Sequence, residues 1–308
     1  MTTDTRAGLL LGFPEYREQA RALAAAAGLV YADVRIHHFP DGESRVQLPP
    51  QLPAEVTLCR SLDHPNARLV ELELAAATAL QLGARQLTLV APYLCYMRQD
   101  IAFHPGEAVS QRIVGELLAR RFHTLITVDP HLHRVHRLDQ AVPVPRAVSL
   151  SAYRAMADFL LQRFDRPFLV GPDAESEQWV RAIAAVHGFD YRVARKERRG
   201  DRDVRIRLPA GDYGDRQLVL VDDVASTGRT LEQTALQLRA HRPASISVLV
   251  THALFVDDAL ERLRRAGIDR VYSSDSVPHP SNRLPLASLL AGALSQTAGP
   301  AAETEKTQ

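Results

Sequence analysis

The chain is poor in cysteine, with only Cys59 and Cys95 among 308 residues. Two cysteines exclude a disulfide framework and are typical of a reducing compartment, so we expect a cytoplasmic protein. Long apolar runs are also missing, because no run reaches the ~18 residues that a membrane span requires. The first residues contain no basic stretch and only a short apolar segment, which is unlike a secretory signal peptide. We therefore expect no membrane partner.

An excess of either charge is absent too. Lys plus Arg number 37 and Asp plus Glu number 36, which leaves a formal net charge of +1. A protein that binds nucleic acid through bulk charge is normally strongly basic, so we expect no nucleic-acid partner. A composition that is 46% hydrophobic and 24% charged excludes disordered and fibrous proteins. The length predicts two globular domains.

Short runs rich in Val, Ile and Leu alternate with longer amphipathic stretches, which is typical of an α/β fold with mainly parallel sheets. The predicted strands are Leu9–Gly12, Glu55–Arg60, Gln86–Pro92, Leu125–Asp129, Pro167–Gly171, Gln217–Val221 and Ile246–His252. The predicted helices are Tyr16–Ala27, Asn66–Leu82, Val109–Arg120, Ser151–Arg163, Ser176–His187, Thr230–His241 and Val256–Ala266. The pattern runs twice, with prolines near the joint. We predict an N-terminal domain over 1–147, a C-terminal domain over 148–296 and a disordered tail over 297–308.

The most informative motif is the segment Val219–Leu231, VLVDDVASTGRTL. An apolar strand ends in two carboxylates, and a turn of small residues then leads into a helix. Ligands bind at the carboxyl ends of strands in open α/β sheets, and backbone N–H groups at a helix N-terminus favour a phosphate. The carboxylates would suit sugar hydroxyls or a Mg²⁺ ion held through water. The alternative is a capped turn in which both acids are merely solvated.

This motif resembles the ribose-5-phosphate loop of the type I phosphoribosyltransferase family. The resemblance implies that Asp222 and Asp223 face the ribose hydroxyls. It also implies that the following residues wrap the 5-phosphate, and these are Ala225, Ser226, Thr227, Gly228, Arg229 and Thr230. The fold implied is a pair of tandem phosphoribosyltransferase-type domains.

Two N-terminal segments resemble the ribose-phosphate pyrophosphokinase family. Residues alone predict a simple hairpin for the first, FPDGESRV at 39–46, because Pro-Asp-Gly favours a turn. In the family this loop presents one aromatic ring and two acids to the adenine of ATP across a subunit boundary. Carried over, these are Phe39, Asp41 and Glu43, and they imply a homo-oligomer, a dimer or higher.

The second segment is PYLCYMRQD at 92–100, directly after a predicted strand. Arginine offers a planar fork suited to phosphate, and glutamine offers a donor and an acceptor to a base. The resemblance makes Arg98 and Gln99 contacts of ATP. Ile101 departs from the pattern, because the family usually has lysine or arginine there. The continuation 103–110 is more similar to archaeal members than to bacterial ones.

Two further segments imply metal ligands. In TVDPH at 127–131 and GPDA at 171–174, the resemblance makes His131 and Asp173 ligands of Mg²⁺, with ribose as the other role for Asp173. Imidazole is not a favoured Mg²⁺ ligand, so the first assignment rests on the family match. A His-x-His pattern after a strand also suggests a zinc site, but no series of further ligands follows. Glu175 departs from the family, which has a small residue there.

A long basic segment, 192–207, carries eight basic residues against three acids. It is interpreted most simply as a solvated basic hairpin. Its Lys196-Glu197-Arg198 triplet, however, matches the catalytic flexible loop of the family. Residues two apart on an extended segment point the same way, so both cations could reach one phosphate chain. A mobile loop could close over the substrates and stabilise charge on the transferred group.

The resemblance spans roughly residues 9–294, with five motifs in the order of the family. It implies an enzyme that transfers the pyrophosphoryl group of Mg-ATP to ribose 5-phosphate, with Mg²⁺ as cofactor. A second hypothesis is a non-catalytic homologue that binds nucleotide and regulates a synthetase, which Ile101 and Glu175 would favour. A third is a phosphoribosyltransferase that acts on a base, which leaves the two N-terminal segments without a purpose. No G-x-x-x-x-G-K-[ST] motif occurs, so a P-loop kinase is excluded.

Overall fold

The computed structural model describes residues 8–198 and 204–297, without the side chains at 196–205 and 297. It divides into two compact units. Unit 1 comprises residues 1–150 and 286–308, and unit 2 comprises residues 151–285. Among the described residues, no helix is long and apolar enough to cross a membrane. Residues 286–296, which the sequence pattern places in the C-terminal domain, contain a helix that lies in unit 1. The expected tail lies outside the described residues, apart from Thr297 at the end of that helix.

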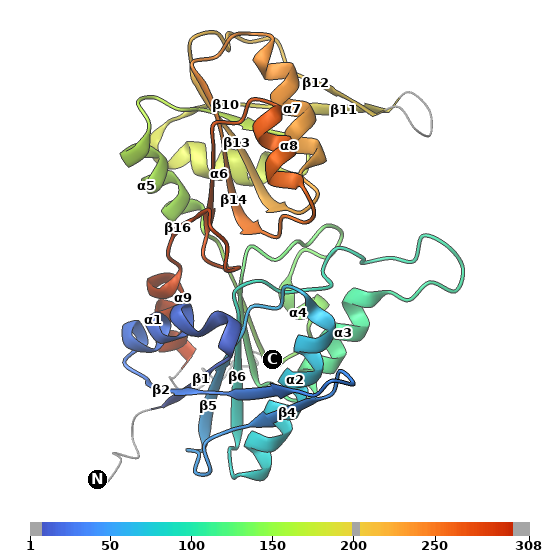
Figure 1. The fold of residues 1–308 in the computed structure, drawn as a ribbon, viewed down its shortest axis with the longest axis vertical. Coiled ribbons are helices and arrows are strands. Elements are labelled where there is room, and N and C mark those ends of the chain that lie inside the picture. Colours follow the sequence, from blue (N-terminus) through green and yellow to red (C-terminus); the bar gives the residue numbers. More distant parts are fainter. Residues whose placement is uncertain (1–7, 199–203, 298–308) are drawn as a thin grey trace, which may run out of the picture. The chain divides into compact units, whose positions relative to one another are not determined.

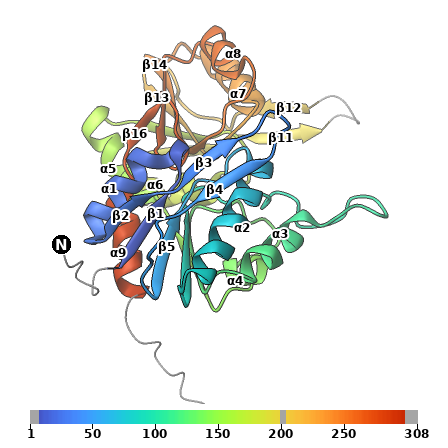
Figure 2. The ribbon, with the colours of Figure 1, turned by 60° about the horizontal axis from the view of Figure 1, so that its bottom comes forward.

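Unit 1 is built on a parallel sheet of six strands in the order β2-β1-β5-β6-β7-β8. The strands are β1 (Leu9–Gly12), β2 (Val30–Asp33), β5 (Glu55–Cys59), β6 (Gln86–Ala91), β7 (Thr124–Val128) and β8 (Arg146–Leu150). The helices are α1 (Arg17–Ala27), α2 (Pro65–Gln81), α3 (Ser110–Ala119), α4 (Leu138–Ala141) and α9 (Ala287–Thr297), with a 3₁₀ turn η1 at Pro14–Tyr16. Helices α1 and α9 pack together on one face, and α2, α3 and α4 cover the other (Figures 1 and 2).

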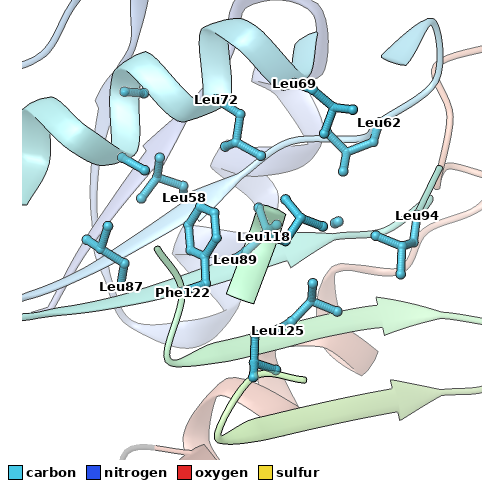
Figure 3. Packing of buried hydrophobic residues seen from close by; sticks show 14 of the residues in the cluster. Leu58, Leu62, Leu69, Leu72, Leu87, Leu89, Leu94, Leu118, Phe122 and Leu125 are labelled. Atoms are coloured by element: carbon cyan, nitrogen blue, oxygen red, sulfur yellow. The ribbon is translucent and has the colours of Figure 1, made fainter. Parts of the chain in front are cut away.

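Leucine side chains fill the space between this sheet and helices α2 and α3. Leu72 of α2 and Leu118 of α3 lie against Leu89 and Leu125 on neighbouring strands (Figure 3). All five residues of β7 are buried, as expected for a parallel strand that is covered on both faces. The buried core fixes the strands, and so it fixes where the loops at their carboxyl ends begin.

A separate two-stranded hairpin projects from unit 1. It consists of β3 (Arg35–His38) and β4 (Ser44–Gln47), which pair in antiparallel register with His38 opposite Ser44. Half-buried Ile36 and Val46 pack against the core of the unit. This hairpin carries the tip residues 39–43.

Unit 2 repeats the architecture with the strand order β10-β9-β13-β14-β15-β16, all parallel. The strands are β9 (Phe168–Gly171), β10 (Asp190–Val193), β13 (Gln217–Ala225), β14 (Ser245–Ala253), β15 (Arg270–Ser274) and β16 (Asn282–Leu284). The helices are α5 (Tyr153–Arg163), α6 (Glu177–His187), α7 (Arg229–Arg239) and α8 (Ala259–Arg265). Helices α7 and α8 lie on one face, and α5 and α6 lie on the other (Figure 1). The predicted fold class is confirmed.

The described part of the basic segment forms two paired strands, as the simplest interpretation, a basic hairpin, requires. After β10 the chain forms a second hairpin, β11 (Arg195–Arg198) with β12 (Val204–Arg207), in antiparallel register. Its tip, residues 199–203, lies outside the described residues. The segment therefore leaves the main sheet of unit 2 as a two-stranded arm (Figure 1).

Candidate active site

In the loop between β13 and α7, hydrogen bonds fix the backbone carbonyl groups toward the segment 254–262. The carbonyl oxygen of Ala225 accepts a hydrogen bond from Leu254 N at 2.9 Å, and that of Ser226 accepts one from Val256 N at 3.2 Å. The carbonyl oxygen of Thr227 accepts from Arg262 Nη2 at 2.5 Å. All three donors belong to the segment that follows β14 and to α8.

This arrangement turns the loop's amides the other way. In a trans peptide the carbonyl of one residue and the N–H of the next point in opposite directions. The N–H groups of Ser226, Thr227 and Gly228 therefore point away from the 254–262 segment. Gly228 caps α7 in the left-handed conformation, with φ +68°, where a side chain would be strained. The loop thus presents consecutive N–H groups at a helix N-terminus, which is an anion-binding arrangement.

The two carboxylates of the motif lie at the carboxyl end of β13. The side chain of Asp223 accepts a hydrogen bond from Val224 N at 2.8 Å, and that of Asp222 accepts one from Asp223 N at 3.1 Å. Burial raises the pKa of Asp222 well above its ordinary range, and the negative charges of Asp223 and Asp173 raise it further. Three carboxylates therefore influence one another in unit 2, and a cation or hydroxyl donors would relieve their repulsion.

Asp173 lies in a tight turn between β9 and α6. Its Oδ1 accepts hydrogen bonds from Glu175 N at 3.2 Å and Ser176 N at 3.3 Å, and Ser176 Oγ donates to its carbonyl at 2.6 Å. A Cβ on Gly171 would lie 2.5 Å from Ser176 Oγ, so the turn needs glycine at 171. Glu175 is exposed, and its backbone N–H helps to close the turn.

A cavity of about 1440 Å³ adjoins this turn. Its lining includes Asp173 and Glu175 of the turn, Arg192 of β10, and Arg195 and Arg207 at the base of the β11–β12 hairpin. The backbone of the two predicted catalytic residues lies on β11, with Lys196 opposite Ile206 and Arg198 opposite Val204. The side chains of Lys196 and Arg198 lie outside the described residues. The cavity combines carboxylates with guanidinium groups, which suits a phosphorylated ligand bound with a cation.

In unit 1, Arg98 and Gln99, the predicted contacts of ATP, lie in the loop after β6. Hydrogen bonds from the first residues of α3 fix this loop. Gln111 N donates to the carbonyl of Gln99 at 3.2 Å, and Gln111 Nε2 donates to the carbonyl of Met97 at 3.0 Å. Ser110 Oγ donates to Gln99 Oε1 at 2.9 Å, and this hydrogen bond fixes the orientation of the Gln99 side-chain amide. Arg98 is exposed, and Ile101 is half-buried.

A second contact ties this loop to the one that carries His131. Asp100, whose side chain is only 1% exposed, accepts hydrogen bonds from the backbone N of Arg134 at 2.9 Å and from its Nη1 at 2.8 Å. His131 is half-buried after β7, where Asp129 takes a positive φ of 38°. Because β6 and β7 are neighbours, Arg98, Gln99 and His131 lie on adjacent loops at one edge of the sheet.

The remaining predicted ATP residues occupy the tip of the β3–β4 hairpin. Phe39 N donates to the carbonyl of Glu43 at 2.8 Å, and Gly42 N donates to the carbonyl of Phe39 at 3.0 Å. Glu43 N also donates to Asp41 Oδ1 at 3.1 Å. The Phe39 ring is 40% exposed and meets the edge of His37 with ring centroids 4.8 Å apart. The tip is a preformed turn that presents an aromatic ring and two carboxylates to solvent.

Among the described side chains, residues 8–195 and 206–296, metal-ligating groups do not converge in a set of three or more. His131 belongs to unit 1 and Asp173 to unit 2, so neither unit holds both predicted ligands. The structure also shows residues that the sequence analysis missed, above all Arg134, Arg262 and Glu71. Arg262 bonds to Thr227 itself, whereas Arg134 and Glu71 bond to residues beside candidate ones, Arg134 to Asp100 and Glu71 to His38 and Ser44. No local motif marks any of the three.

The sequence of the chain matches two protein-family models. Residues 9–121 match the N-terminal domain of ribose phosphate pyrophosphokinase, and residues 149–279 match the phosphoribosyl transferase domain. A ribose-phosphate pyrophosphokinase of Methanopyrus kandleri is 33% identical over 294 residues, covering 94% of this chain and 100% of the relative. That of Methanosarcina acetivorans is 30% identical over 288 residues, covering 92% and 98%.

A solved structure shares the fold of the whole chain. The phosphoribosylpyrophosphate synthetase of Mycobacterium smegmatis superposes with a TM-score of 0.80 at 20% sequence identity. The match covers 95% of this chain and 99% of that one. Both halves of the chain, in this order and over this length, match one family, so the chain belongs to the ribose-phosphate pyrophosphokinase family.

Proposed function

We propose that this protein transfers the β,γ-pyrophosphoryl group of ATP to the 1-hydroxyl of ribose 5-phosphate, giving phosphoribosyl pyrophosphate and AMP. The observation that carries the proposal is the loop after β13. Hydrogen bonds fix the carbonyl groups of Ala225, Ser226 and Thr227, so that the N–H groups that follow them point in the opposite direction. Asp222 and Asp223 lie just before this loop. Membership of the family, shown by relatives that match over their whole length, supports the same activity.

Ribose 5-phosphate binds to this loop in unit 2. The 5-phosphate takes the N–H groups of Ser226, Thr227 and Gly228, together with the hydroxyls of Thr227 and Thr230. Asp222 and Asp223 accept hydrogen bonds from the vicinal ribose hydroxyls. A ligand bound in this way directs its 1-hydroxyl away from the phosphate loop.

ATP binds to unit 1. Arg98 contacts the phosphate chain, and the side-chain N–H₂ of Gln99 donates to the base, because Ser110 already uses the amide oxygen. Phe39, Asp41 and Glu43 reach the adenine of a neighbouring subunit, since the hairpin that carries them projects with an exposed tip. The active enzyme is therefore a homo-oligomer.

Magnesium is the proposed cofactor. His131 in unit 1 and Asp173 in unit 2 are the candidate ligands, and burial together with the negative charges of Asp223 and Asp173 raises the pKa of Asp222, so a cation nearby would favour its ionised form. Oxygen donors suit Mg²⁺, and water completes its shell. When bound, the ion neutralises charge on the phosphate oxygens during transfer.

The protein's own residues then lower the barrier. The 1-hydroxyl oxygen attacks the β-phosphorus and gives up its proton to water. The bond from that phosphorus to the α,β-bridging oxygen breaks, and AMP leaves with that oxygen. Negative charge builds up on the transferred phosphoryl oxygens, and Lys196 and Arg198 stabilise it. No side chain need form a covalent intermediate.

The test is AMP release from ATP and Mg²⁺, measured with and without ribose 5-phosphate. AMP that depends on ribose 5-phosphate supports the synthetase. A base phosphoribosyltransferase would instead consume phosphoribosyl pyrophosphate with a free base and would need no ATP. A regulatory homologue would bind ATP saturably and release no AMP.

A further inference from the structure

The buried carboxylate of Glu71 forms hydrogen bonds with both strands of the β3–β4 hairpin. Glu71 lies on α2, and its side chain is 2% exposed. Its Oε1 accepts hydrogen bonds from His38 Nε2 at 2.7 Å and from Ser44 Oγ at 2.8 Å. His38 is the last residue of β3 and Ser44 is the first of β4, and the two face each other in the ladder. Both bonds are therefore made where the tip begins and ends.

The other oxygen of Glu71 is fixed to the body of unit 1. Arg60 Nη2 donates to Oε2 at 2.5 Å, and Arg60 Nε donates to Glu15 Oε1 at 2.6 Å. The Arg60 guanidinium is buried and lies 4.2 Å from the centre of the Phe13 ring. Arg60 directly follows the central strand β5, so the carboxylate is anchored to the sheet. A buried network with each charge paired is rigid.

The ionised form of Glu71 is the one that makes these bonds. Burial raises the pKa of this carboxyl, but hydrogen bonds from Arg60, Ser44 and His38 lower it more, and the pKa lies below its ordinary value. Glu71 therefore accepts from all three donors at neutral pH.

Little else holds the hairpin near its tip. The two strands form a sheet of their own, with no ladder to the six-stranded sheet in the described part of the unit. Ile36 and Val46 pack on the core farther from the tip. The direction in which Phe39, Asp41 and Glu43 project is thus set by how the strands are held at His38 and Ser44.

We propose that Glu71 is a positioning residue for ATP, which fixes the β3–β4 hairpin through His38 and Ser44 so that the tip reaches the adenine of a neighbouring subunit. This inference rests on the proposed function of the tip. Glu71 touches no substrate and acts only through the hairpin. The sites that accept the pyrophosphoryl group lie in unit 2 and are independent of it.

The most specific test removes the two hydrogen bonds between the hairpin and Glu71 and keeps the bond between Glu71 and Arg60. The double variant His38→Ala/Ser44→Ala deletes both hairpin bonds to Glu71 but leaves the Arg60–Glu71 pair intact. We expect KM for ATP to rise about tenfold, equivalent to about 1.4 kcal/mol. We expect kcat and KM for ribose 5-phosphate to stay within about twofold, because uniform binding of one substrate is what is lost. Amide hydrogen exchange at residues 37–45 should quicken, with exchange elsewhere unchanged.

The matched control is Arg35→Ala/Gln47→Ala, the facing pair at the far end of the same hairpin. Both residues are exposed, and this variant should keep the KM for ATP of the wild type. Equal effects of the two double variants would overturn the inference, because any damage to the hairpin would then suffice. An unchanged KM for ATP in the His38/Ser44 variant would overturn it as well.

Phe39→Ala separates this inference from the function on which it rests. If Phe39→Ala raises KM for ATP and the His38/Ser44 variant does not, the tip binds ATP and only the role of Glu71 fails. If Phe39→Ala leaves KM for ATP unchanged, the assignment of the tip to ATP fails, and the inference fails with it. Should the double variant not fold, Ser44→Ala alone removes one of the two bonds, and we expect about a threefold rise in KM.

Discussion

Asp100 and Arg134 join two neighbouring loops through one carboxylate. The backbone N–H of Arg134 donates to Oδ2, and its guanidinium donates to Oδ1. Asp100 follows directly on Arg98 and Gln99, while Arg134 lies three residues after His131. The Asp100–Arg134 pair therefore ties the loop of the candidate ATP contacts to the loop of the candidate metal ligand. Ile101, the next residue along the chain, is half-buried.

The first prediction concerns the pH dependence of this pair. Burial raises the pKa of Asp100, but the hydrogen bonds from Arg134 lower it more, so the folded pKa lies below the ordinary 3.8. The carboxylate thus stabilises the fold fully above its unfolded pKa, and this contribution is lost as the pH falls through the folded pKa. Asp100→Asn should cost about 2 kcal/mol at pH 7, the scale of hydrogen bonds to a charged group.

Unfolding measured from pH 7 down to pH 3 checks this prediction. The gap in stability between wild type and Asp100→Asn should narrow as the pH approaches and passes below 4. Asp139→Asn is the control, because Asp139 pairs with Arg137 on the exposed surface, where ion pairs contribute little. A gap for Asp100→Asn that stays constant with pH would show that the lost charge is not its cause.

The second prediction concerns Arg262. Its guanidinium holds the carbonyl of Thr227 and also pairs with Glu232 Oε2 at 3.3 Å. Without it, the carbonyl is free to turn, and the amide of Gly228 turns with it. Arg262→Gln should raise KM for ribose 5-phosphate about tenfold and leave KM for ATP unchanged. Steady-state kinetics in each substrate provide the measurement, with Arg265→Gln, an exposed arginine on the same helix, as the control. Equal shifts in both KM values would contradict a role confined to the phosphate loop.

The third prediction concerns the β11–β12 arm. Lys196→Ala should cut turnover by about two or more orders of magnitude, the scale on which losing one preorganised charge acts, and should leave folding intact. Lys196→Arg should keep part of the activity, because it retains the charge. Turnover of Lys196→Ala near that of wild type would remove this residue from the mechanism.

The fourth prediction combines two variants that are each impaired in one part of the proposed site, assayed at an ATP concentration well below KM. If the hairpin tip serves a neighbouring subunit, mixing Phe39→Ala/Glu43→Ala subunits with Lys196→Ala subunits rebuilds some complete sites. We expect the mixture, after dissociation and reassembly, to exceed the summed activity of its two components several-fold. Additive activity would place the tip and Lys196 in the same subunit's site, or would exclude the tip from any site.

Buried segments of the fold could be predicted from the sequence, and the edges of the sheets could not. β1, β5, β6, β7, β9 and β14 coincide with apolar runs, since both of their faces are covered. β13 begins with such a run but continues four residues past its predicted end at Val221. β2 and β10 have exposed and half-buried residues, so their runs lack that signal. Helix α9 joins unit 1 through contacts with α1, which is more than 250 residues away along the chain, and no local pattern indicates such a return.

The residues of the candidate site also fall into those that the sequence predicts and those that only the fold reveals. The loop residues around Asp223 and Gln99 stand in contiguous motifs, so the sequence predicts them. The residues that hold those loops, such as Arg262 and Arg134, come from other elements and become visible only once the strands are placed side by side. Glu71 shows this most clearly, because its partners His38 and Ser44 lie 33 and 27 residues away. A charged residue in a helix predicts a solvated surface until the fold buries it.

Phosphorus NMR of the reaction with ATP, Mg²⁺ and ribose 5-phosphate tests the central claim most directly. The account predicts loss of ATP, appearance of AMP and a new diphosphate carried on C1 of the sugar, all dependent on ribose 5-phosphate. Asp223→Asn, which weakens the hold on the ribose hydroxyls, should slow all three signals together. Formation of ADP with a singly phosphorylated product, or saturable ATP binding with no change in the phosphorus spectrum, would contradict pyrophosphoryl transfer by this protein.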